Sequence, residues 1–390
     1  LQQRTSSAVS WRKKRNISYK ECAMSVYVFI VLATLILGLL MPQQGEKRKY
    51  YIVLMAVIHA FILGFRYQYL TGDLLKYQWN YAHLYEHGWF SEHVLSEGRN
   101  TGFNMLMKLV ALLFNNQFQP FLVILAVFSA IVVAVLIYRY SPAPWMSYLI
   151  WNCLGFYIFG FSAIKQALAM NFVMLAFIGI AERKLSFYLI MMALAGFIHS
   201  PALIFLPAYW LAQQKMSLWM VIFYVAAGIL ISVFKDQFVK FIMSFYYEED
   251  AVEIFSGELG SRFVMICLLC AFGVLFKGFK GWTFNSLFHI MAVAAILQML
   301  SSFNNIFTRL ADYYFQLSIL YVPLVFFERE RYPQPAGMPP VLPFTKRSLW
   351  AMAIILSLFF LWFYNTYIIG VEIKVEVDNY LNYRFMWDVK

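Results

Sequence analysis

Four basic residues stand close to the ends of apolar segments, which the composition below identifies as membrane spans. They are Arg66, Lys165, Arg262 and Arg309. A cation at this depth usually faces a cavity or a partner rather than lipid. A single one can extend its charged end to a lipid phosphate, but four on one face favour a shared anionic ligand. We therefore predict that these residues bind an anion at that face.

Further polar side chains lie next to these charges. Gln166 follows Lys165 in IKQALAM, so that the pair can donate to one ligand. Asp73 follows a glycine in GFRYQYLTGD, and His199 and Ser200 lie between two apolar halves in GFIHSPALIF. Imidazole changes its charge near neutral pH, which makes His199 a candidate for proton transfer. The order of residues predicts no Ser–His–Asp triad.

One carboxylate lies inside an apolar helix. Asp312 stands one helical turn after Arg309 in TRLADYYF. At this spacing the carboxylate can neutralise the arginine, because residues three apart share a helix face. An ionisable pair so close to the end of a span is also a candidate site.

The stretch YQWNYAHLYEH is rich in aromatic residues at helical spacing. Tyr77, Tyr81, Leu84 and Tyr85 share one face of a helix, which predicts an amphipathic helix at the membrane surface. An interfacial aromatic belt explains these rings, but it does not explain the nearby Arg66 and Asp73. Aromatic rings can also stack on the apolar faces of sugars.

Histidine and cysteine pairs give no strong metal signal. His83 and His87 share a helix face, with His93, Glu86 and Glu92 nearby, but no third ligand follows at a typical spacing. We therefore predict no metal site. Cys267 and Cys270 form a CxxC inside the apolar run VMICLLCAFGVLF, where neither a redox nor a metal role is expected.

The composition defines the class of protein. Of 390 residues, 62% are hydrophobic and 13% charged, too few charges to cover a soluble domain. Apolar runs long enough to cross about 30 Å of hydrocarbon recur along the chain. We predict an all-α polytopic membrane protein with about 10–12 spans. Candidate spans fall at 24–41, 50–65, 119–138, 143–160, 165–181, 217–234, 261–277, 282–302, 306–327 and 348–369.

The basic loops set the predicted orientation. The net charge of +11 indicates topology rather than nucleic-acid binding, because Lys and Arg crowd short loops on one face. This face carries Lys47–Lys49, Arg139, Arg183, Lys184, Lys215, Lys277, Lys280, Arg329, Arg331, Lys346 and Arg347. It is cytoplasmic if positive residues stay inside. The alternation requires 101–118 to be interfacial or re-entrant. It also requires 185–213 to enter and leave on the same side, either as a hairpin of half-helices, which we favour, or as one bent long helix.

The predicted domain organisation is a single transmembrane domain at 24–370, with outer loops at 66–118 and 235–260. A tail at 371–390 follows it. The basic stretch 1–23 contains RKKR, which would lie on the outer face against the charge rule. We expect it to be an extension, with a native start near Met24.

Four stretches in this order resemble the EpsG family, relatives of the Wzy-type polysaccharide polymerases. They are GFRYQYLTGDLLKY, IKQALAM, IHSPALIFLP and TRLADYYF, within a resemblance covering about 24–370. Lys165 stands where many members carry arginine, which alone offers the bidentate fork for phosphate. The resemblance implies a bacterial inner-membrane protein, compatible with a GT-C-like arrangement.

The activity that the resemblance implies is polymerisation of polyprenyl-diphosphate-linked glycan units at the outer leaflet. Arg66, Lys165, Arg262 and Arg309 would hold the diphosphate. Asp73 or His199 would activate the acceptor hydroxyl. Tyr77, Trp79, Tyr81, Gln166 and Ser200 would contact sugar or acceptor. No metal-binding carboxylate pair is evident, so we predict a metal-independent glycosyltransferase without cofactors. Membrane lipids, a flippase and a chain-length regulator are the expected partners.

Three other functions fit parts of the sequence. A transporter of lipid-linked glycans would need cations through the membrane depth, whereas these gather at outer ends. A membrane O-acyltransferase would use a buried histidine and a cytoplasmic acyl donor, which His199 near the outer side fits poorly. A structural partner in an export complex is the third.

Overall fold

The computed structural model describes the protein as a set of helices. Besides helices, the described residues contain one β-bridge, between Arg66 and Phe385. The predicted all-α fold is thereby confirmed. The predicted tail 1–23 lies outside the described residues, as does most of 235–260 and of 371–390. The described ranges are 26–67, 72–95, 101–234, 236–237, 260–277, 281–304, 306–327, 349–350, 352–354, 356–357, 360 and 385–387.

Several helices are long and apolar enough to cross a membrane. They are α6 (Phe118–Tyr140), α9 (Ile164–Ala181) and α15 (Trp282–Leu300). The pair α16 (Ile306–Phe315) and α17 (Ser318–Phe327), bent by 47°, adds a fourth if it forms one span. Shorter apolar helices of 10–17 residues are Val26–Leu40, Thr101–Leu113, Leu185–Ile198, Ser200–Ala212, Leu218–Val233 and Ser261–Phe276. The polytopic class is confirmed, and the total of about 10–12 spans stays a prediction.

The chain divides into two compact units. The first comprises Leu1–Ala134, Trp151–Ala167 and Phe359–Lys390, and the second Val135–Ile150 and Leu168–Leu358. The helices α6, α7 (Pro144–Cys153) and α9 contribute residues to both. The prediction of one transmembrane domain at 24–370 stays a prediction.

In the first unit, a buried polar network joins α2 (Arg48–Gly64) to α7 and α8 (Phe156–Phe159). His59 is 1% exposed; its Nδ1 lies 2.7 Å from the Met55 carbonyl oxygen and its Nε2 2.8 Å from the Asn152 side-chain oxygen. Tyr157 donates a hydrogen bond of 2.9 Å to the His59 carbonyl. Polar groups away from water must be satisfied by such partners. The network therefore fixes how these helices pack.

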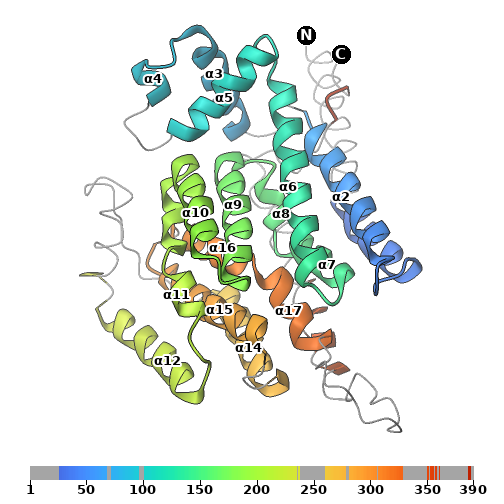
Figure 1. Ribbon diagram of the computed structural model, residues 1–390, viewed down its shortest axis with the longest axis vertical. Coiled ribbons are helices and arrows are strands. Elements are labelled where there is room, and N and C mark those ends of the chain that lie inside the picture. The colour runs from blue at the N-terminus through green and yellow to red at the C-terminus, as the bar shows by residue number, and fades with distance from the viewer. Residues whose placement is uncertain are drawn as a thin grey trace, which may run out of the picture. The chain divides into compact units, whose positions relative to one another are not determined.

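The aromatic stretch forms α3 (Gly72–Glu86), as predicted. Leu74, Tyr81 and Leu84 are buried on one face, whereas Trp79 on the opposite side is 72% exposed. The helix packs against α5 (Thr101–Leu113), and α4 (Glu92–Leu95) packs there too (Figure 1). The apolar face of α3 therefore packs against other helices, whereas Trp79 lies at the surface.

The predicted hairpin is confirmed in the second unit. Helix α10 (Leu185–Ile198) is followed by His199, whose backbone is extended, and Pro201 stands in the first turn of the 3₁₀ helix η2 (Ser200–Phe205). The Tyr188 hydroxyl donates a hydrogen bond of 2.6 Å to the Phe205 carbonyl, so the chain folds back along α10 before α11 (Ala208–Ala212). Pro201 has no backbone N–H to donate to the Phe197 carbonyl and its ring would clash with that carbonyl, so α10 cannot continue through it, which explains the break.

Basic residues of the second unit gather where α6 and α9 end. Arg139 lies 3.0 Å from Glu182, and Lys184 lies 2.7 Å from the same carboxylate. The hydrogen bond from Lys184 lowers the pKa of Glu182. Arg183 lies over the ring of Trp282, at 3.9 Å, where α15 begins. Three residues of the predicted basic face therefore lie at these helix ends, and the sidedness of that face stays a prediction.

The orientation of that face is testable by cysteine labelling. We expect a cysteine introduced between 235 and 260 to react with a membrane-impermeant reagent in intact cells, because that loop is predicted to be outside. A cysteine at Lys184 should react only after the cells are opened. Both are placed in a chain without its own four cysteines. Protection at 235–260 together with labelling at Lys184 would invert the orientation.

Candidate functional site

A buried ion pair joins two helices of the second unit. Arg262 lies in the first turn of α14 (Ser261–Lys277), and its guanidinium donates to the carboxylate of Asp312 in α16. Asp312 is fully buried, and Arg262 lies over the ring of Phe315, at 5.0 Å. The sequence pattern offered Arg309 as the partner of Asp312. The structure pairs Asp312 with Arg262, because Asp312 points into the bundle whereas Arg309 is exposed.

Arg309 stands in the first turns of α16, after a polar turn. Asn304 caps the helix, since its side-chain oxygen accepts from the Ile306 backbone N–H at 2.9 Å. Gln298 donates to the hydroxyls of Ser301 and Thr308, at 2.8 and 3.4 Å. This turn presents Arg309 to the outside of the bundle, one helical turn before Asp312. Arg309 and Arg262 thus form a cationic patch, and the carboxylate of Asp312 lies behind it.

The hairpin packs against the same helix. Tyr314 of α16 donates a hydrogen bond of 2.6 Å to the Ile204 carbonyl of η2, and its ring lies 4.7 Å from that of Phe205. His199 and Ser200, both half-buried, stand where η2 begins. The second unit therefore places Arg262, Arg309, His199 and Ser200 on elements that pack together.

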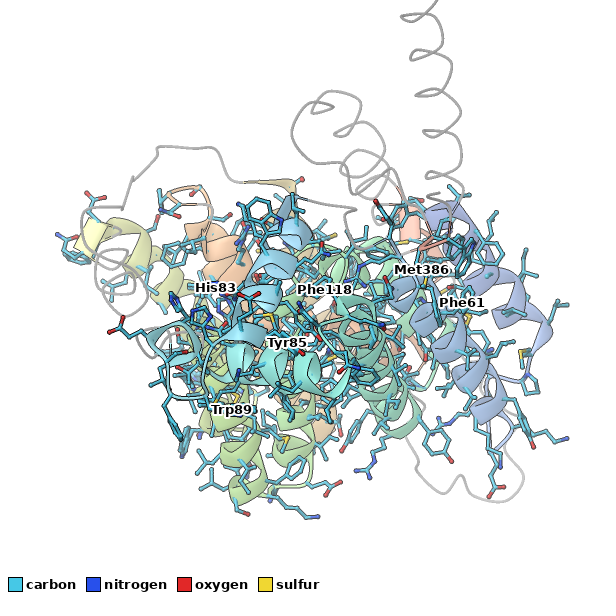
Figure 2. All side chains as sticks on the ribbon, turned by 90° about the horizontal axis from the view of Figure 1, so that it is seen from above. Phe61, His83, Tyr85, Trp89, Phe118 and Met386 are labelled. Carbon is cyan, nitrogen blue, oxygen red and sulfur yellow. The ribbon has the colours of Figure 1, made fainter. Side chains whose placement is uncertain are left out.

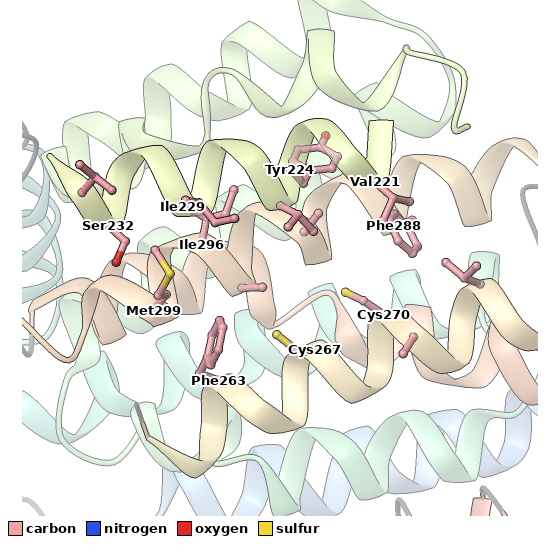
Figure 3. A pocket seen from close by; sticks show the side chains of 17 residues that line it. Val221, Tyr224, Ile229, Ser232, Phe263, Cys267, Cys270, Phe288, Ile296 and Met299 are labelled. Atoms are coloured by element: carbon pink, nitrogen blue, oxygen red, sulfur yellow. The ribbon is translucent and has the colours of Figure 1, made fainter. Parts of the chain in front are cut away.

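An apolar pocket of about 620 Å³ begins next to this patch. It lies between α12 (Leu218–Val233), α14 and α15 (Figure 3). Phe263, which follows Arg262, lines one end together with Met299, which precedes the polar turn. Cys267 and Cys270, both free thiols, line its middle. Apolar space of this size beside a cation suits a ligand with a charged head and a hydrocarbon tail.

Arg66 lies in the first unit and is covered. Its side chain is 1% exposed; its guanidinium donates to the Leu63 carbonyl and lies over the ring of Phe161, at 5.7 Å. The segment at 385–387 pairs with the chain here, as Met386 N–H donates to the Phe65 carbonyl at 2.9 Å (Figure 2). We expected an arginine open to a ligand. In the structure, other parts of the protein cover its guanidinium.

Lys165 and Gln166 stand in the first turn of α9. Lys165 is half-buried and Gln166 is 4% exposed. Phe161, which lies under Arg66, precedes Lys165 by four residues, in the turn before α9. Arg66 is therefore near the segment that leads to Lys165 within the first unit, whereas Arg262 and Arg309 belong to the second.

The residues predicted to contact sugar differ in exposure. Tyr81 is 1% exposed, packs on Phe118 and donates a hydrogen bond of 3.0 Å to the Gln117 carbonyl. Burial raises the pKa of Tyr81 to about 12, which keeps its hydroxyl as a donor. The role of Tyr81 is packing in this structure, because α5 and α6 cover the face that carries it. Trp79 offers an open ring.

The two other α3 candidates lie near the surface. Tyr77 packs edge-on against Phe103, with ring centroids 5.6 Å apart. Asp73 is exposed and forms an ion pair with Lys76, at 3.8 Å. His199, in contrast, is half-buried where η2 begins, and η2 packs against α16.

Sequence reasoning missed Lys108. This lysine is 3% exposed and donates to the carbonyls of Leu84, at 2.9 Å, and of His87. The available signal was its position in TGFNMLMKLVALL, one helical turn after Asn104. Two polar residues at this spacing share one face of an otherwise apolar helix and can contact the same neighbouring segment. The buried pair ties α5 to the end of α3.

Comparison with known proteins adds one match. No curated protein and no solved structure is detectably similar to this chain. A sequence model of the EpsG family matches residues 49–385. This range includes the patch of Arg262 and Arg309, the hairpin and α3. The chain, an all-helical membrane protein by its fold, therefore belongs to the EpsG family.

Proposed function

We propose that this protein is a polysaccharide polymerase that joins polyprenyl-diphosphate-linked glycan units at the outer face of the bacterial cytoplasmic membrane. Membership of the EpsG family makes it a membrane protein of polysaccharide biosynthesis. Our proposal adds the polymerase activity, the lipid-linked substrate and the location in the inner membrane. Association with a flippase and a chain-length regulator belongs to the same proposal.

One observation carries the proposal: a cationic patch stands beside an apolar pocket within a single unit. Arg262 lies in the first turn of α14, and the next residue lines a pocket of about 620 Å³. A polyprenyl diphosphate combines a doubly charged head with a long hydrocarbon tail. Arginine suits the head, because its planar fork can bind phosphate oxygens bidentately. The pocket suits a stretch of the tail.

In the proposed reaction, an acceptor hydroxyl attacks the anomeric carbon of the lipid-linked sugar. The new glycosidic bond forms as the bond from that carbon to the diphosphate oxygen breaks, and the leaving group is polyprenyl diphosphate. Arg309 and Arg262 stabilise the negative charge that develops on the leaving oxygen. His199, or else Asp73, takes the hydroxyl proton.

The remaining residues keep supporting roles in this proposal. Asp312 orients Arg262 and balances its charge until the diphosphate arrives. Arg66 and Lys165 stay proposed ligands of the diphosphate, although binding at Arg66 requires its protein cover to open. Gln166, Ser200, Tyr77 and Trp79 are proposed to contact sugar or acceptor. The chemistry uses no metal.

The proposal is tested by supplying purified protein with a polyprenyl-diphosphate oligosaccharide in the presence of EDTA. We expect a ladder of longer glycans on a gel, because charge stabilisation comes from side chains. Arg66→Ala and Lys165→Ala, each checked for folding by size exclusion, should shorten the ladder. Wild-type protein that leaves the donor unchanged, yet moves it across vesicle membranes, would establish the transporter instead.

A further inference from the structure

Three histidines of the first unit come together where α3 ends. Each of His83, His87 and His93 offers a ring nitrogen, and these atoms all lie within 4.8 Å of one another. The ring centroids are 4.1 Å apart for His83 and His87, and 4.5 and 4.6 Å from each of these to His93. His87 is half-buried and the other two are exposed. An ion from solution can therefore reach the cluster.

The third histidine arrives through the fold rather than through helical spacing. His83 and His87 share a face because they are one turn apart in α3. A turn then leads into α4, with Ser91 donating a hydrogen bond of 2.8 Å to the Gly88 carbonyl. This turn returns the chain and sets His93 against the pair, six residues after His87. Sequence spacing therefore gave two ligands, and the structure supplies a third.

Buried polar side chains of α5 hold the backbone of this cluster. Lys108 donates to the His87 carbonyl, and Asn104 donates a hydrogen bond of 3.0 Å to the His93 carbonyl. Both side chains are nearly inaccessible, at 3% and 5% exposure. Asn80 of α3 donates in turn to Asn104, at 3.3 Å. One helix thus fixes the positions of two of the three histidines.

The hydrogen bond of His87 also prepares it as a ligand. Its Nδ1 lies 2.7 Å from the His83 carbonyl oxygen, which can only accept, so Nδ1 carries the proton. Nε2 is then left with its lone pair. Metal-binding histidines usually have their second nitrogen held in this way by a carbonyl or carboxylate, which fixes tautomer and ring orientation.

We propose that His83, His87 and His93 bind one zinc-class divalent ion. Neutral imidazole suits Zn²⁺, Cu²⁺ and Ni²⁺, whereas Mg²⁺ and Ca²⁺ prefer oxygen ligands. A tetrahedral site with bonds of about 2.0–2.1 Å places its nitrogens about 3.3 Å apart, which the exposed rings of His83 and His93 reach by small rotations. The fourth position is open to water.

The bound ion links the end of α3 to α4 in the predicted outer loop. It takes no part in the proposed glycan transfer, because none of the three histidines belongs to the residues assigned to donor or acceptor. Metal binding at this site can therefore be tested independently of the proposed function.

The test measures metal binding by the full chain in detergent, purified without a polyhistidine tag. Calorimetry with ZnCl₂ is expected to give one site per chain, and CoCl₂ to give the intense visible absorption of tetrahedral Co²⁺. His83→Ala, His87→Ala and His93→Ala should each weaken Zn²⁺ binding at least tenfold. His199→Ala, which removes a histidine elsewhere, should leave the affinity unchanged, and MgCl₂ should give no binding.

Folding and ligation are separated by a metal-free control. His93→Ala without zinc should melt at the wild-type temperature, since its ring is exposed. Adding zinc should then raise the melting temperature of the wild type but not that of His93→Ala at the same zinc concentration. The proposal is overturned by a wild-type chain that binds no Zn²⁺, or by a triple histidine variant that binds it as tightly as wild type.

Discussion

Replacing Arg309 by alanine is expected to lower kcat/KM for glycan transfer by about 10²–10³-fold. In the proposed reaction this loss is large, because Arg309 is a preorganised donor to the charge that develops in the transition state as the diphosphate leaves. Arg309 is exposed on α16, so its removal creates no cavity in the bundle. The measurement is the initial rate of ladder formation at several donor concentrations, which separates kcat from KM.

Two matched variants make this result specific. Arg309→Lys keeps the charge but lacks the planar fork, and we expect a smaller loss of activity than for alanine. Lys184→Ala removes an exposed cation at the basic face of the same unit, where it pairs with Glu182, and activity should stay at the wild-type level. Equal rates for Arg309→Ala and wild type would remove Arg309 from the site.

The helices and the hairpin were predictable because their causes are local. Apolar runs of span length predicted α6, α9 and α15 within a few residues of their observed ends. Two halves too short to span, separated by a histidine, a serine and Pro201, predicted a hairpin with its tip at His199. Tyr188 then closes it through a contact that spacing did not reveal.

The sequence-based predictions failed where a residue contacts a different helix or a segment beyond a turn. Helical spacing indicated Arg309 as the partner of Asp312, but the buried carboxylate forms its ion pair with Arg262 of α14, and Arg309 acts on it only through its charge. Tyr81 shares a face with Tyr77, yet only contact with α6 makes it a packing residue. His93 joins His83 and His87 through a turn. Spacing along one helix indicates a face, and it cannot show what that face meets.

The second large effect is expected for Asp312→Ala. This change leaves the guanidinium of Arg262, mostly buried between α14 and α16, without its carboxylate. Breaking a buried ion pair from one side costs about 3–5 kcal/mol, because an uncompensated charge remains. We expect a lower melting temperature in detergent and a smaller folded yield. Wild-type melting behaviour would contradict the structural pairing of these residues.

A double variant separates the pair's contribution to stability from its role in the reaction. Arg262→Met with Asp312→Leu replaces both charges by apolar side chains, and such a replacement is often neutral for stability. The double variant should therefore melt close to wild type, and the coupling energy in a double-mutant cycle should be large. Its glycan transfer should remain poor, since Arg262 no longer stabilises the leaving diphosphate. Recovery of stability and activity together would show that Arg262 serves the fold alone and would leave Arg309 to carry the charge stabilisation.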